Sequence, residues 1–143
     1  MAYYLFPAAR QDTLSPAAVI RQRLAEGFWG VPERSHHVRA LKSGDRACFY
    51  ASGDGVVAHA IIGDTADRPI PAERRTLGWL DQGRLMLPMS SATFLPSRVV
   101  LSPAVRAGLD AFQGKDPFAV WSWFVQNTRR LTAHDFEMLT RSR

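Results

Sequence analysis

Residues 46–63, RACFYASGDGVVAHAIIG, contain two apolar runs of strand-forming residues separated by the short polar segment SGDG. In the first run, Ala47, Phe49 and Ala51 would point one way and the residues between them the other, because successive side chains of a strand alternate in direction. The second run is rich in β-branched residues, and SGDG has the composition of a tight turn. The pattern predicts a β-hairpin, so the fold must contain an antiparallel strand pair.

Two further elements are expected before this hairpin. YYLFPAA, residues 3–9, is rich in aromatic residues and is interrupted by proline, which predicts a short strand at or near a sheet edge. Ser15 followed by Pro16 is typical of a helix start, and Gly27 is typical of a helix end. The apolar residues between them recur at helical spacing, so we expect a helix over residues 16–26.

The second half of the chain is expected to add strands and then helices. Residues 64–83 are mostly loop by composition, RLMLPM and ATFLPSRVVL are strand candidates, and their prolines favour edges or bulges. Helices are expected for AVRAGLDAF behind Ser102-Pro103, for the aromatic segment PFAVWSWFVQ, and for HDFEMLT, where Thr132 and Asp135 resemble a capping box. The order predicts one α+β domain over residues 1–143, with a curved or barrel-like mixed sheet flanked by helices.

The charge balance favours an anionic partner such as nucleic acid. Eighteen Lys+Arg against thirteen Asp+Glu give a formal net charge of +5, and nearly all the basic residues are arginine. The planar guanidinium suits phosphates and stacks on bases, although genome composition alone also produces an arginine bias. No cofactor is expected.

Several features bear on compartment and on metals. The single cysteine, Cys48, excludes an internal disulfide, and the sequence shows no signal peptide and no apolar run of about 18 residues, so a cytoplasmic protein without a membrane span is expected. Cys48 lies in an apolar strand, where it is expected to be buried. His36, His37, His59 and His134 lack metal-ligand spacing, so no metal site is expected.

A set of motifs resembles the EVE domain family, a member of the PUA-like superfamily related in fold to YTH domains. Trp29-Gly30-Val31 is followed by the pattern K-x-G-D-x-x-x-x-Y, which runs here from Lys42 to Tyr50, and the chain ends with an aromatic segment and LTAHDFEML. The match covers the first 63 residues and, more weakly, the last 25. Residues 64–116 align with nothing in the family, so the loops expected around a binding cleft are undefined.

The resemblance implies a non-catalytic reader that holds a modified base of DNA or RNA, such as a methylated one, flipped from its stack, in an aromatic-lined pocket of a PUA-like sheet. The base pocket is then expected to use Trp29 and Tyr50 as walls, and Ser35 and the Gly30 backbone at the base edge. Trp79 and Trp121 are further aromatic candidates, each of which is equally explained as a packing residue, as is Trp29. The phosphate strip is expected from Arg34, Arg39, Lys42 and Arg46, with Arg74-Arg75 and Arg129-Arg130 as second choices.

Two other function classes stay open. PUA-like folds include ASCH-type domains that resemble small hydrolases, and Lys42, Glu73 and Ser35 supply the residue types that such an enzyme uses. Alternatively, the chain is an adaptor subunit of a larger nucleic-acid-processing complex. Because no Walker motif, dinucleotide loop or nuclease-like carboxylate cluster is visible, any strand cleavage would belong to a nuclease or modification-system partner.

Overall fold

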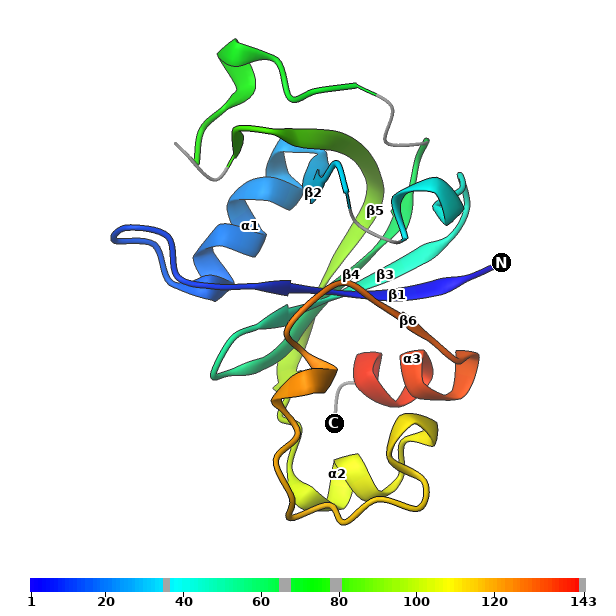
Figure 1. Cartoon of the computed structure of the whole chain (residues 1–143). Coiled ribbons are helices and arrows are strands. Elements are labelled where there is room, and N and C mark those ends of the chain that lie inside the picture. Colours follow the sequence, from blue (N-terminus) through cyan, green and yellow to red (C-terminus); the bar gives the residue numbers. More distant parts are fainter. Residues whose placement is uncertain (35–36, 65–67, 78–80, 142–143) are drawn as a thin grey trace.

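The computed structural model describes residues 1–34, 37–64, 68–77 and 81–141, and its centre is one curved six-stranded sheet (Figure 1). Along the sheet the strand order is β2-β5-β4-β3-β1-β6. The strands are β1 (Tyr3–Ala8), β2 (Phe28–Pro32), β3 (Arg46–Ala51), β4 (Gly55–Ile62), β5 (Arg84–Val99) and β6 (Arg129–Leu131). The helices are α1 (Pro16–Glu26), α2 (Pro103–Ala107) and α3 (Ala133–Thr140), and among the described residues none of the helices is long and apolar enough to cross a bilayer.

The sheet is mixed, which confirms the predicted α+β class with a curved mixed sheet. β1 pairs in parallel with β3, whereas the β3–β4, β4–β5, β2–β5 and β1–β6 pairs are antiparallel. The predicted hairpin is present as β3 and β4, joined by the turn at residues 52–54. Because β1 lies between β3 and the short edge strand β6, its predicted place near a sheet edge is also correct.

A single long strand, β5, replaces the two strands expected from RLMLPM and ATFLPSRVVL. It spans 16 residues and continues through Pro88 and Pro96. Its first part pairs with β2, with Pro88 opposite Phe28, and its later part pairs with β4. Pro88 thus lies where β5 changes partner, a position at which the missing N–H interrupts no continuous ladder. This change of partner, together with the irregular β4–β5 register, curves the sheet.

Helix α1 begins and ends where the sequence predicts. The Ser15 side chain accepts a hydrogen bond from the Ala18 N–H, and Pro16 occupies the first turn. Gly27 adopts the left-handed conformation with φ of 81°, and its N–H donates to the carbonyls of Arg23 and Leu24. A glycine is favoured here because a side chain in this conformation is strained.

The C-terminal segment departs from the expected helices. Ser102 caps α2 as predicted, but the helix ends after five residues, and PFAVWSWFVQ forms only a 3-10 turn at Ser122–Phe124. Thr132 accepts from the Asp135 N–H as predicted, whereas the Asp135 carboxylate accepts from the N–H groups of Asp110 and Ala111. Strand β6 was not predicted, because its three residues, Arg-Arg-Leu, carry no periodic signal.

The two faces of the sheet carry separate hydrophobic clusters. One contains Phe6, Trp29 and Phe49 and lies under α1. The other contains Cys48, Tyr50 and residues of α3. Figure 1 shows α1 on one side of the sheet and α2 and α3 on the other. Since both faces are covered, adjacent residues of β3 enter different cores.

The thiol of Cys48 is expected to be unreactive in the folded protein. It is fully buried, and burial raises its pKa above the ordinary range, while the thiolate is the reactive form. At pH 8 we expect a thiol reagent such as Ellman's reagent to react about 100-fold or more slowly with the native protein than with the guanidinium-unfolded chain, since reaction requires opening. Reaction at similar rates in both states would contradict this burial.

Candidate binding pocket

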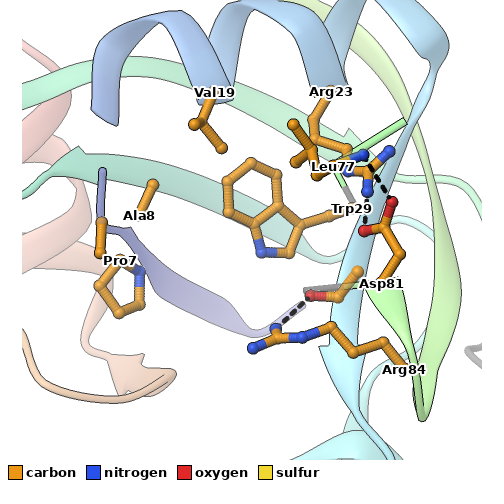
Figure 2. A pocket seen from close by; sticks show the side chains of 10 residues that line it. Pro7, Ala8, Val19, Arg23, Trp29, Leu77, Asp81 and Arg84 are labelled. Carbon is orange, nitrogen blue, oxygen red and sulfur yellow. Dashed lines mark hydrogen bonds and ion pairs between the residues drawn. The ribbon is translucent and has the colours of Figure 1, made fainter. Parts of the chain in front are cut away.

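A pocket of about 180 Å³ opens between α1, the end of β1, strand β2 and the start of β5. Among the described residues its walls combine the aromatic Trp29, small apolar residues and charged side chains (Figure 2). The lining residues are Pro7, Ala8, Ala9, Val19, Arg23, Trp29, Gly30, Leu77, Asp81 and Arg84. This volume is below the roughly 300–1,000 Å³ of pockets for drug-sized ligands, so it suits a single small ring.

Trp29 belongs both to the core and to the pocket. Its side chain is 7% exposed, and its ring centroid lies 4.8 Å from that of Phe49 and 6.3 Å from that of Phe6. The indole also lines the cavity, where Figure 2 shows Val19 and Pro7 around it. The sequence offered two explanations for Trp29, packing in the core and lining a pocket, and both apply. Only a limited part of the ring is exposed to the cavity.

A buried ion pair between Arg23 of α1 and Asp81 forms one wall of the pocket. Both side chains are 2% exposed, and the guanidinium of Arg23 contacts the Asp81 carboxylate directly. The second carboxylate oxygen of Asp81 accepts from the Leu77 N–H at 3.0 Å, and Arg23 lies over the Phe28 ring at 4.5 Å. These contacts fix the segment before β5 against α1 and hold the wall in one geometry.

Arg84 supplies hydrogen-bond donors at the other wall. Its guanidinium donates to the Gly30 carbonyl at 3.2 Å, its one hydrogen bond within the described part of the chain. Burial lowers the pKa of Arg84, and the nearby Asp81 partly offsets this effect. A Cβ on Gly30 would lie 3.4 Å from Cδ of Arg84 and 3.2 Å from Cδ1 of Ile70, so glycine leaves room for the arginine stem. The remaining N–H groups of Arg84 have no acceptor among the described residues and can donate to a ligand.

The structure separates the predicted base-pocket residues into three groups. Trp29 and Gly30 line the pocket. Tyr50, whose pKa is raised by burial, and Trp121, which lies under Arg106 at 4.6 Å, pack in the cluster on the opposite face of the sheet. The prediction that Trp29 and Tyr50 are two walls of one pocket is therefore wrong, because Tyr50 follows Phe49 in β3 and points the other way. Ser35 and Trp79 lie outside the described residues.

The predicted phosphate strip does not border this pocket. Arg34, Arg39 and Lys42 are exposed, and Arg46 is half-buried at the start of β3. Arg46 pairs with Tyr3, whereas the pocket lies at residues 7–9, the other end of β1.

The pocket's own charged residues, Arg23, Asp81 and Arg84, were not predicted. One signal for Arg23 was available: it follows Ile20 by three positions, so it lies on the apolar face of its helix. A charged residue on such a face requires a buried partner. The partner, Asp81, is 58 residues away and carries no local signal.

The residue types of a hydrolase do not converge at the pocket. Lys42 and Glu73 are exposed, and neither lines it. In the described ranges, side-chain ligand atoms of Asp110, His134 and Asp135 gather within 4.8 Å of one another. Nε2 of His134 lies 2.9 Å from the Gly108 carbonyl, which raises the pKa of this histidine, and Asp135 binds backbone N–H groups. These contacts connect α3 to residues 108–111, which follow α2.

Comparison with known proteins finds solved structures of similar fold but no matching family. No family model matches the sequence, and no curated protein matches it. The NMR structure of Rpa0253 from Rhodopseudomonas palustris is similar, with a TM-score of 0.60 and 20% identity over 98% of this chain and 91% of that one. The crystal structure of Atu2648 from Agrobacterium tumefaciens is similar with a TM-score of 0.55 and 15% identity, over 99% and 92% of the two chains. The chain shares its fold with these two proteins.

Proposed function

We propose that this protein is a non-catalytic reader that holds a flipped, modified base of DNA or RNA in the Trp29 pocket. The observation that carries this proposal is the convergence of an indole, an apolar wall and the guanidinium of Arg84 around a space that suits one ring. A heterocyclic base has an apolar face and carbonyl or ring-nitrogen acceptors at its edge, which match these groups. The net charge of +5 favours the polymer to which the base is attached.

The expected interaction free energies in the pocket are large enough to offset the cost of flipping a base. Flipping a base costs a few kcal/mol, and contact with an aromatic side chain returns about 1–3 kcal/mol. Because Phe49 covers part of Trp29, we expect the lower end of that range. A hydrogen bond from the charged Arg84 adds about 1.5–3 kcal/mol, and an added methyl group against Val19 or Leu77 discriminates by about 1–3 kcal/mol.

The resemblance to the EVE domain family supports the same function. Two residues of its W-G-V type motif, Trp29 and Gly30, line the pocket. The motif thus has a physical explanation here: the tryptophan contributes the aromatic surface, and the glycine admits the stem of Arg84.

The proposal is tested by oligonucleotide binding of wild type and Arg84→Gln. The panel contains plain oligonucleotides and matches with 5-methylcytosine, 5-hydroxymethylcytosine or N6-methyladenine, as DNA and as RNA, measured by calorimetry. We expect wild type to bind one modified strand several-fold more tightly than its plain match. Arg84→Gln should lose about tenfold or more in affinity for that strand, since one charged hydrogen bond is removed.

Arg98→Gln is the matched control, because Arg98 is exposed and pairs with Asp54 outside the pocket. It should bind the modified strand as wild type does, apart from the small effect of removing one charge. Two results would contradict the proposed reader function: wild type that prefers no modified strand, or an equal loss of affinity in Arg84→Gln and Arg98→Gln.

An adaptor role is a second candidate, favoured by one surface feature. Phe118 and Val120 are 80% and 82% exposed in the segment between α2 and β6. Exposed large apolar side chains of this kind are typical of protein-binding surfaces. A nuclease or modification enzyme bound there would supply the chemistry. If the protein is only an adaptor, wild type should bind modified and plain oligonucleotides equally in the experiment above.

A further inference from the structure

A second pocket, of about 310 Å³, lies at the β6 edge of the sheet. It is lined by His37, Trp123, Asn127, Thr128, Arg129 and Arg130. Among the described residues its lining is mostly polar or cationic and contains no carboxylate, unlike that of the Trp29 pocket, where Asp81 is present. We name it the β6 pocket.

The cations at the β6 pocket have no acidic partner among the described residues. Arg129 lies over the Trp123 ring at 4.9 Å, and the Lys115 ammonium lies 5.2 Å from the same ring. Across the described ranges, Arg129, Arg130 and Lys115 take part in no ion pair, and the two guanidinium groups make no hydrogen bond. Because Arg129 and Lys115 lie against the same ring without a carboxylate partner among the described residues, they repel one another, and a bound anion relieves that repulsion.

The β6 pocket lies beside the start of strand β1, whereas the end of β1 lines the Trp29 pocket. Arg130 lies opposite Tyr4 in the antiparallel β1–β6 pair, and directly opposite residues lie on the same face of a sheet. Tyr4 packs in the cluster that contains Trp29, so Arg130 lies on that face, whereas Arg129, opposite Leu5 of the other cluster, lies on the other face. Both arginines line the β6 pocket because it lies at the edge of the sheet. Tyr4 and Ala8, which lines the Trp29 pocket, are four residues apart in β1, about 14 Å along a strand.

We infer that the β6 pocket binds a phosphate group of the strand that carries the flipped base, with Arg129 and Arg130 as its ligands. The inference rests on the proposed function for the base in the Trp29 pocket. The guanidinium groups of Arg129 and Arg130, which approach the sheet edge from its two faces, suit phosphate oxygens because each can donate two parallel hydrogen bonds. Arg46 of the predicted strip lies at the same end of β1 as the β6 pocket, because Arg46 pairs with Tyr3 and Arg130 with Tyr4.

The test compares Arg129→Gln/Arg130→Gln with Arg98→Gln/Arg141→Gln. Each double variant removes two positive charges and has a formal net charge of +3, from +5 − 2. Arg98 and Arg141 are exposed and pair with Asp54 and Glu137. The dissociation constants of plain and modified oligonucleotides are measured from about 50 to about 200 mM salt, because the slope of log affinity against log salt reports how many phosphates the protein neutralises.

We expect the Arg129/Arg130 variant to weaken plain and modified strands by the same factor, several-fold or more, and to lower the salt slope by about 0.7–0.9 for each phosphate that is no longer bound. The ratio of affinities for modified and plain strands should stay as in wild type. Arg129→Lys/Arg130→Lys, which keeps the charge, should retain most of the slope and confirm that the fold is intact.

Two results would overturn the inference: an unchanged salt slope in the Arg129/Arg130 variant, or an equal reduction of slope in the Arg98/Arg141 control. Failure of the proposed function has a different signature. In that case wild type shows no preference between modified and plain strands, while the reduced slope on removing Arg129 and Arg130 still reports phosphate binding at the β6 pocket.

Discussion

Replacing Asp81 with alanine is expected to lower the free energy of unfolding by about 3–5 kcal/mol, because it leaves the guanidinium of Arg23 buried without its carboxylate. Both side chains are 2% exposed, so little water is in contact with Arg23 to take the place of the missing carboxylate. The remaining contacts of Arg23, with Thr76 at 3.3 Å and Glu26 at 3.4 Å, are long and compensate only in part. Equilibrium unfolding in urea, followed by fluorescence, measures the loss.

The matched variant is Arg23→Met/Asp81→Ala, which removes both charges and keeps a long side chain over Phe28. We expect it to be more stable than Asp81→Ala alone, because no unpaired charge stays buried. A loss below about 1 kcal/mol in Asp81→Ala would mean that water reaches Arg23 in solution. The pocket wall would then be less rigid than the two buried side chains indicate.

Local signals in the sequence predicted the elements whose geometry is determined locally. The hairpin of β3 and β4 follows from alternation and a short turn, and α1 follows from Ser15, Pro16 and Gly27. The sequence divided β5 into two strands at Ser90-Ser91, and Pro88 and Pro96, which lie inside the two predicted strands, were expected to place them at edges or bulges. Whether a proline interrupts a strand depends on which neighbour needs its N–H, and that is a property of the sheet.

The pocket was predicted only in part, because its charged walls come from segments far apart in the chain. Trp29 and Gly30 were found by the motif they share, whereas Arg23 and Asp81 meet across 58 residues. Tyr50 was assigned to the pocket since alternation in β3 separates two faces without saying which face meets the cavity. With both faces covered by hydrophobic clusters, polarity gives no sign of the difference.

The predicted strip of basic residues shows the same limit. Arg34, Arg39, Lys42 and Arg46 are neighbours in sequence, and Arg46 lies at the end of β1 away from the Trp29 pocket. Arg129 and Arg130, a second choice from sequence, meet the start of β1 only because β6 joins its edge, so they lie at the same end of β1 as Arg46. A three-residue edge strand carries too little pattern to be found in advance.

Replacing Trp29 with alanine is expected to produce the largest combined effect, on stability and on binding. The side chain is 7% exposed and packs against Phe49 and Phe6, so its truncation should lower the free energy of unfolding by about 3–5 kcal/mol. The same truncation removes the aromatic surface of the pocket, and the preference for a modified base should disappear with it. Denaturant unfolding and oligonucleotide binding, measured on the same preparation, separate the two effects.

Two further variants make this result interpretable. Trp29→Phe keeps an aromatic ring against Phe49 and should cost less stability, about 1–2 kcal/mol. It enlarges the cavity and should weaken the preference for the modified base. Phe49→Leu removes packing from the covered side of the indole without touching the pocket lining, so it should lose stability and keep the base preference. If Phe49→Leu and Trp29→Phe lose the preference equally, Trp29 acts in binding only through the stability of the core.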